Sequence, residues 1–331
     1  MTEAITSLKG SLTTPDARAE AAVRARAEQV LRPLGALQRF DDIAIWLAGW
    51  QRTPSPQVES VECIVFAADH GVASTGVSAY PQEVTGAMLR ALRQGVATAS
   101  VMCSALGIEL SVVDVGVGRP TGDITAEPAM SRARFEECWL AGAESVSRLQ
   151  HPDLLVVGEM GIGNTTAAAA VSAALFGGDA EIWVGVGTGV TGSALEKKKA
   201  AVDAAIRRVG HAEPMEVLRQ VGGSELVAIA GAVMEARARS IPVVLDGFVV
   251  TSACAAVELA RGGALAHTVA GHCSPEPGHR LLLDMLGKPP ILDLSMRLGE
   301  ASGALAAVPL IRLAASCVTD VATFDEWGLS R

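Results

Sequence analysis

The sequence contains no block of Lys or Arg, and its formal net charge is −9. This charge balance argues against a surface that binds nucleic acid or anionic membranes. No apolar window of about 18 residues is free of charges and turn signals, and the richest one, residues 241–260, contains Asp246 and Glu258. The start of the chain lacks the apolar stretch of a secretory signal. We therefore expect a cytoplasmic protein without a membrane segment.

Paired cysteine spacings are also missing. The six cysteines lie at positions 63, 103, 138, 254, 273 and 317, and none forms a CxxC motif, so we expect reduced thiols in the core. His272, Cys273 and His279 in HCSPEPGH are candidate metal ligands, but zinc sites usually need a second closely spaced pair elsewhere. We expect neither a metal nor a cofactor.

Short apolar runs alternate with helical segments along most of the chain, in which 50% of the 331 residues are hydrophobic. The runs are continuous rather than alternating, as expected for strands that are covered on both faces. This pattern predicts an α/β fold with a mainly parallel, Rossmann-like sheet and helices on both faces. The predicted strands are residues 61–69, 108–116, 153–159, 181–186, 241–248, 265–271 and 289–294.

The two ends of the chain are predicted to be helical, over parts of residues 14–50 and over about 302–318. The segment RTPSPQ marks a boundary after the first helices. We predict a large α/β catalytic domain at residues 55–300. A small helical domain would combine residues 1–54 with residues 301–331.

The segment LLVVGEMGIGNTTAAAAVSAAL, residues 154–175, is the most informative motif. A strand that ends in a glycine-rich turn and opens a helix presents free backbone N–H groups to an anion. A carboxylate is unfavourable beside a phosphate, so Glu159 is expected to face an uncharged or cationic part of the ligand. The same order of strand, glycine-rich turn with a glutamate, and helix recurs at LGEASG, which contains Glu300. Together the two turns predict an enzyme that holds a phosphorylated sugar and acts on it with a carboxylate.

A third turn, GVGTGVTG, fits the GxGxxG dinucleotide fingerprint with Gly187, Gly189 and Gly192. The fingerprint also requires a second strand that ends in an acidic residue about 20 residues further on, and here the helix continues instead. A helix N-terminus that holds a monophosphate fits better, with Lys198 as a counter-charge. The alternative is that residues 197–199 are an ordinary solvated helix face.

Six strand ends in all carry polar or glycine-rich sequence, and we expect them to meet at one rim of the sheet. The first contains Asp69 and His70, which either fix the loop by a hydrogen bond or contact substrate. The fifth contains Ser274, a neutral hydrogen-bond donor. No GxSxG nucleophile motif is present.

The motifs ADHGVASTGVSAYPQEVT, GEMGIGNTT, GVGTGV, VGGSELVAIAGA, IPVVLDGF, HCSPEPGH and MRLGEASGALA resemble the nicotinate-nucleotide–dimethylbenzimidazole phosphoribosyltransferase family. The resemblance covers roughly residues 33–312, in the family's order. It implies transfer of the 5-phosphoribosyl group of nicotinate mononucleotide, with inversion, to a nitrogen of a benzimidazole-like base, for the lower ligand of cobalamin. It also implies that the protein is a homodimer and that the molecules it binds are these small substrates.

The resemblance implies roles for individual residues. Glu300 would be the general base, and Glu159 would orient the base or stabilise the ribose cation. The expected phosphate contacts are Gly161, Gly187, Thr188, Gly189 and Lys198, and the expected ribose and nicotinate contacts are Asp246 and Ser274. The expected contacts to the aromatic base are Ser78, Tyr80, Gln82, Met160 and Leu298. The chain departs from the family at Thr191–Gly192, where an acidic pair is expected.

Three other functions are compatible with the motifs. The same fold could use another acceptor, such as a purine or a phenol. An NAD-dependent oxidoreductase would use GVGTGVTG, although the strand and acidic residue it needs are missing. A nucleotide-binding regulatory module would bind nicotinate mononucleotide without releasing nicotinate.

Overall fold

A five-stranded parallel sheet forms the centre of the computed structural model, which describes residues 8, 10–187 and 189–330. Its strands are β1 (Val61–Ala68), β2 (Glu109–Gly116), β3 (Leu154–Met160), β4 (Val243–Leu245) and β5 (Thr268–Ala270), in the order β2-β1-β3-β4-β5. The predicted parallel α/β fold is confirmed. From β1 the chain moves to β2 on one side and then returns to β3 on the other. In sheets of this kind, ligands bind beyond the carboxyl ends of the strands at this switch point.

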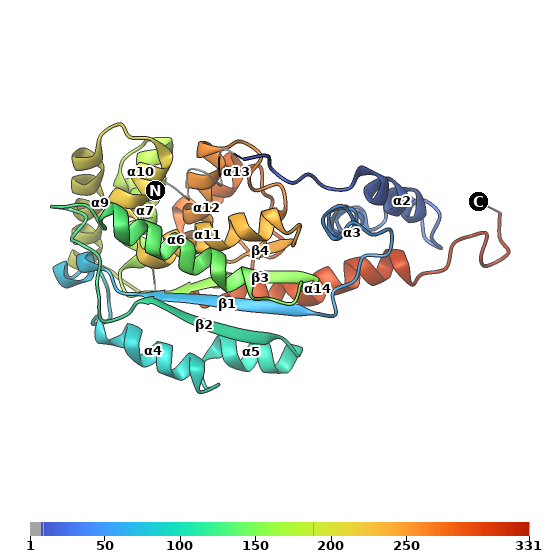
Figure 1. Cartoon of the computed structure of the whole chain (residues 1–331), viewed down its shortest axis with the longest axis horizontal. Helices are drawn as coiled ribbons and strands as arrows, with labels where there is room; N and C mark the ends of the chain where they lie inside the picture. Colours follow the sequence, from blue (N-terminus) through green and yellow to red (C-terminus); the bar gives the residue numbers. More distant parts are fainter. Residues whose placement is uncertain (1–7, 9, 188, 331) are drawn as a thin grey trace.

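Helices cover both faces of the sheet (Figure 1). Before β2 the chain forms α2 (Ala17–Ala27), α3 (Gln38–Gln51), the 3₁₀ helix η1 (Gly71–Thr75), α4 (Glu83–Arg93) and α5 (Thr98–Leu106). Between β2 and β4 it forms α6 (Arg132–Ser147), α7 (Asn164–Phe176), α8 (Ala180–Trp183), α9 (Ser193–Val209), α10 (Pro214–Val221) and α11 (Ser224–Ala238). The last helices are α12 (Phe248–Ala260), α13 (Pro277–Met285) and α14 (Ser302–Thr319).

Successive residues of β1 enter two different cores. Ile64 and Phe66 pack with α6, α7, α11 and α12, whereas Cys63 and Val65 pack with α3, α5 and α14. Because neighbouring side chains of a strand point to opposite faces, a strand covered on both faces must be apolar at every position. This explains the continuous apolar runs of the sequence.

Two of the predicted strands are absent from the described structure. Residues 181–186 lie in α8 and the loop after it, where Asp179 caps the helix by accepting a hydrogen bond from Glu181 N and Trp183 is buried. Residues 289–294 form only an isolated bridge, between His272 and Leu292. Proline has no N–H to donate to a sheet, so the consecutive prolines at 289 and 290 limit this segment to a short contact beside β5.

Helices α6 and α11 cross at very short range through two glycines. A Cβ added to Gly142 of α6 would lie 1.8 Å from Ala228 O, and one added to Gly231 of α11 would lie 2.2 Å from Trp139 O. Each glycine therefore receives the backbone of the opposite helix. The contact fixes α11, whose Glu225 lies beside Gly161 in the glycine-rich turn after β3.

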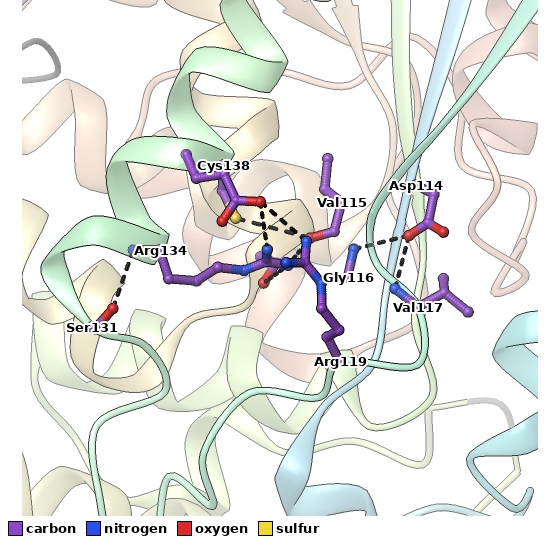
Figure 2. Close-up of polar contacts among 10 residues, drawn as sticks. Asp114, Val115, Gly116, Val117, Arg119, Ser131, Arg134 and Cys138 are labelled. Atoms are coloured by element: carbon purple, nitrogen blue, oxygen red, sulfur yellow. Dashed lines mark hydrogen bonds and ion pairs between the residues drawn. The ribbon is translucent and has the colours of Figure 1, made fainter.

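The edge strand β2 is fixed to α6 at its carboxyl end. Figure 2 shows the Arg134 guanidinium donating to Val115 O, while Ser131 caps α6 by accepting a hydrogen bond from Arg134 N at 3.2 Å. Asp114 Oδ1 accepts the N–H groups of Gly116 and Val117, at 3.0 and 2.8 Å. These hydrogen bonds satisfy backbone polar groups at the carboxyl end of β2, where no further strand of the described structure pairs with them.

The two chain ends meet at α14, which begins under the sheet and runs out beside α2 and α3 (Figure 1). Its first turns share a core with β1 and β3, and Val318 near its end packs with Val23 and Ala44. By length and composition α14 could cross a membrane, but 56% of its window is buried inside the protein. The division into domains at residues 55 and 300 stays a prediction.

Candidate active site

A cavity of about 540 Å³ opens at the carboxyl ends of the strands. All six predicted turns contribute to it, with one or more residues each: Ser78 and Tyr80; Glu159 to Thr165; Gly187 and Val190; Gly247 and Phe248; His272, Ser274 and Glu276; and Leu298 to Glu300. The predicted convergence on a single rim is therefore observed, although the third turn follows α8 rather than a strand.

Glu159 lies at the end of β3 and is buried. Its carboxylate accepts a hydrogen bond from Asn164 Nδ2 in the first turn of α7. Burial raises the pKa of Glu159 well above its usual range, and the carboxylates of Asp246 and Glu225 raise it further. A cationic ligand would offset this accumulation of negative charge.

Glu300 lies just before α14 and faces the same cavity. Its N–H donates to Glu159 O at 3.0 Å, so one backbone hydrogen bond joins the two acidic residues. Its Oε2 accepts the N–H of Ala99, at the start of α5, at 3.4 Å. Burial raises the pKa of Glu300, and the hydrogen bond from Ala99 opposes this change. A buried carboxylate with a raised pKa is suited to general-base chemistry near neutral pH.

The turn that carries Glu300 has an unusual backbone. Gly299, Glu300 and Ala301 have φ values of 85°, 60° and 66°. A left-handed conformation at two successive non-glycine residues is costly and persists only where the surroundings impose it. A Cβ on Gly299 would lie 2.7 Å from Glu159 Oε1, so the Glu159 carboxylate rests directly on this turn.

One wall of the cavity is mainly apolar. Four of the five residues predicted to contact the aromatic base line it: Ser78, Tyr80, Met160 and Leu298. Tyr80 and Leu298 are 51% and 45% exposed, and Val84 and Met88 of α4 extend the same wall. Gln82 is not among the lining residues; it precedes α4 as the N-cap residue.

A second wall of the cavity is polar, and Ser274 is part of it. His279 Nδ1 accepts the Ser274 N–H at 2.9 Å, so the ring carries its proton on Nε2 and donates it to Thr251 Oγ1 at 3.2 Å. Burial lowers the pKa of His279 to about 3, which keeps the ring neutral. Both nitrogens of His279 are engaged within the protein, and no group of three or more metal-ligand side chains was found among the described residues.

Of the predicted phosphate residues, Gly187 and Lys198 lie together: a Cβ added to Gly187 would lie 3.2 Å from Lys198 Nζ. Gly161 and Gly187 line the cavity, whereas Lys198 lies behind it and donates from Nζ to Gly185 O at 3.0 Å. Lys198 is buried, so the alternative of a solvated helix face is wrong for this residue. Burial lowers the pKa of Lys198, and Glu276 opposes this change.

Two other predicted residues, Gly189 and Asp246, lie outside the lining. Gly189 belongs to the loop before α9 but does not line the cavity, and Thr188 is outside the described residues. Asp246 is buried at the end of β4, and its Oδ1 accepts the N–H of Ala304 at 3.0 Å.

His70 does not line the cavity, which decides between its two interpretations. Its Nε2 lies 2.6 Å from Glu225 Oε1, and both side chains are fully buried. Asp69 Oδ2 accepts the Gly118 N–H at 2.7 Å. Both residues therefore fix loops, and the His70–Glu225 pair lies beside Gly161.

Several contributors to the site were not identified from the sequence, among them Glu276, Asn164 and the Ala99 amide. Glu276 lines the cavity, and its Oε1 accepts the Gly187 N–H at 2.7 Å. An acid directly before the proline that begins α13 was a usable signal for this residue. Asn164, the partner of Glu159, could have been noticed as the first residue of α7. The Ala99 amide had no signal, because a backbone group 201 residues from Glu300 leaves no trace in the sequence.

The class of this protein follows from its similarity to known proteins. A family model described as "Phosphoribosyltransferase" matches residues 12–329. The chain is thus an enzyme of the phosphoribosyltransferase class, in agreement with a cavity that combines glycine-rich turns and buried carboxylates.

Individual relatives narrow the assignment. Nicotinate-nucleotide–dimethylbenzimidazole phosphoribosyltransferase of Cereibacter sphaeroides is 47% identical, over 97% of this chain and 95% of its own. The enzyme of that name from Methylocella silvestris is 48% identical, over 98% and 95%. The crystal structure of CobT from Thermus thermophilus matches with a TM-score of 0.91 and 42% identity, over 95% of this chain and 99% of that one. The chain belongs to the nicotinate-nucleotide–dimethylbenzimidazole phosphoribosyltransferase family.

Proposed function

We propose that this enzyme transfers the 5-phosphoribosyl group of nicotinate mononucleotide to a ring nitrogen of 5,6-dimethylbenzimidazole and releases nicotinate. The observation that carries the proposal is the pair of buried carboxylates, Glu159 and Glu300, joined by one backbone hydrogen bond between an apolar wall and a glycine-rich polar wall. The names and the high identity of the relatives support the same substrates.

The chemistry suits these walls. The pyridinium of the donor is already a cationic leaving group, so its departure needs no general acid. The acceptor azole is a better nucleophile once its N–H proton is removed, and Glu300 takes that proton as the new C–N bond forms. Glu159 places negative charge beside the ribose as it becomes cationic. Attack opposite to the departing nicotinate inverts the anomeric centre and gives the α-riboside.

The two walls divide the substrates. The apolar wall with Tyr80, Met160 and Leu298 receives the flat aromatic base. The turns at Gly161 and Gly187 receive the phosphate, with Lys198 as the nearby cation. The Gly187 N–H, which donates to Glu276 in this structure, would exchange that acceptor for the phosphate. Ser274, held by His279, remains for the nicotinate and ribose.

Release of nicotinate from nicotinate mononucleotide tests the proposal. We expect release only when dimethylbenzimidazole is added, and a loss of about 10²–10⁴-fold in kcat for Glu300→Gln. Glu144→Gln is the matched control, because Glu144 is exposed on α6 and pairs with Arg148. Release with a purine or a phenol but not with the benzimidazole would change the acceptor. Binding of the nucleotide without release under any condition would support the regulatory module instead.

We further propose a cytoplasmic homodimer. The six cysteines are free, which suits a reducing compartment. Val101 on α5 and Leu313 on α14 are 56% and 51% exposed, and apolar surface of this kind is often covered by a second subunit. Light scattering coupled to size exclusion should give twice the chain mass of 34.1 kDa; a value equal to one chain would contradict the dimer.

A further inference from the structure

Asp246 lies one residue from the cavity but does not reach it. Gly247 lines the cavity, whereas Asp246 is only 1% exposed. Its Oδ2 is fully buried and has no hydrogen-bond partner among the described residues. A ligand in the cavity therefore cannot contact this carboxylate as it stands, which conflicts with the ribose or nicotinate contact implied by family resemblance.

The carboxylate of Asp246 instead caps the N-terminal end of α14. The N-cap residue of that helix, Ala301, has no side chain that can accept a hydrogen bond, and its backbone is left-handed. The first N–H groups of a helix need acceptors, and a negative charge at this end also interacts favourably with the helix dipole. Asp246 Oδ1 accepts the N–H of Ala304 at 3.0 Å, so β4 supplies the missing cap.

Other close contacts show how tightly the same helix end is seated. A Cβ on Gly158 of β3 would lie 2.3 Å from Ala301 N, and one on Gly271 would lie 2.6 Å from Ala304 Cα. A Cβ on Gly303 would lie 2.0 Å from the His272 ring, and that ring is itself 3.5 Å from Asp246 Oδ1. The first turn of α14 thus rests on the ends of β3, β4 and β5.

The strained turn directly before this helix carries Glu300. Its three positive φ values require an outside constraint at each end. The hydrogen bond from Glu300 N to Glu159 O supplies the constraint on one side, and the capped helix supplies it on the other.

We propose that Asp246 is a positioning residue, whose carboxylate caps α14 and thereby holds the Glu300 turn in its left-handed conformation. The inference rests on the proposed role of Glu300 as general base. It gives Asp246 no contact with the nucleotide.

Two substitutions separate the cap from a ligand contact. Asp246→Asn keeps an oxygen that accepts the Ala304 N–H, whereas Asp246→Ala removes it. At saturating substrates we expect Asp246→Ala to lower kcat about 10–100-fold, because small displacements of a catalytic group have effects of this size. The KM for nicotinate mononucleotide should stay within about threefold, and Asp246→Asn should restore most of kcat.

Hydrogen exchange of the amides of residues 302–306 gives a readout independent of activity. We expect faster exchange in Asp246→Ala than in the wild type, and wild-type exchange in Asp246→Asn. Unchanged exchange in Asp246→Ala would overturn the proposal, as would an equal rise in the nucleotide KM in both variants, which is the signature of a ligand contact. If Asp246→Ala does not fold, wild-type exchange and kcat in Asp246→Asn still support the cap, and a large kcat loss there contradicts it. A wild-type kcat in Glu300→Gln would overturn the base assignment instead, without affecting the exchange result.

Discussion

At the scale of residues, burial raises the pKa of the two carboxylates that we propose to act in this site, Glu159 and Glu300. Glu300 is buried beside Glu159 and Asp246, with one backbone N–H as its hydrogen-bond donor. Burial raises the pKa of Glu300 above its ordinary value of 4.5. In the proposed reaction, the deprotonated form accepts the proton of the base.

The pH profile of kcat should report this ionisation. As pH falls through the raised pKa, Glu300 becomes protonated and kcat should fall, so that the acid limb lies above pH 4.5. The measurement is kcat at saturating substrates between pH 4.5 and 9, in the wild type and in Glu159→Gln. Glu159 also titrates in this cavity, and a limb that disappears in Glu159→Gln would assign it to Glu159 instead.

Gly299 should tolerate no side chain. An alanine there would place its Cβ 2.7 Å from Glu159 Oε1 while keeping a φ of 85°. We expect Gly299→Ala to lower kcat at least about tenfold through displacement of the two carboxylates. Gly287→Ala is the matched control, because Gly287 has a φ of 63° and nothing within 4 Å of its Cβ position. Equal losses in both variants would show that backbone strain alone is responsible.

At the scale of elements, strands and turns were predicted correctly where a single local feature of the sequence determines them. β1 and β3 were recognisable because both faces are buried, so that every position had to be apolar. Residues 181–186 looked like a strand for the same reason, yet a local cap at Asp179 and the buried Trp183 favour a short helix. The six turns were found because glycine and acidic residues mark strand ends. The contact between Asp246 and Ala304 was not predicted, because its partners are 58 residues apart.

Two helix glycines allow a test of how closely the layers pack. A Cβ on Gly142 would meet Ala228 O at 1.8 Å, whereas one on Gly86 in α4 would have its nearest neighbour at 3.6 Å. We expect Gly142→Ala to destabilise the protein by about 1–3 kcal/mol through overpacking. Gly86→Ala should stabilise it by about 0.4–1 kcal/mol, since alanine restricts the unfolded chain. Denaturant midpoints measure both, and equal effects would contradict the close crossing of α6 and α11.

At the scale of the whole molecule, burial of the Glu159 carboxylate in the site lowers the stability of the fold. The pKa of Glu159 is raised in the folded state. Between its ordinary value and its folded value, the folded protein binds a proton that the unfolded chain has released, so stability falls as pH rises through this window. Above the folded pKa the full penalty of a buried charge remains.

Glu159→Gln should therefore make the protein more stable and less active. At pH 8 we expect its Tm to rise by about 1–2 °C if roughly 1 kcal/mol is relieved, and the gain should shrink toward pH 5. The matched control is again Glu144→Gln, for which no change is expected. A lower Tm for Glu159→Gln at pH 8 would show that the hydrogen bond from Asn164 outweighs the burial of charge.

The Glu159–Glu300 pair and part of the apolar wall come from different parts of the chain. The acidic pair is set by main-chain geometry from β3 and α14, whereas Val84 and Met88 of the apolar wall come from α4, on a separate excursion of the chain. Under the proposed function, substitutions in α4 would reshape the surface that meets the base without moving Glu300. We therefore expect substitutions to change the preference for the acceptor more readily than the reaction itself.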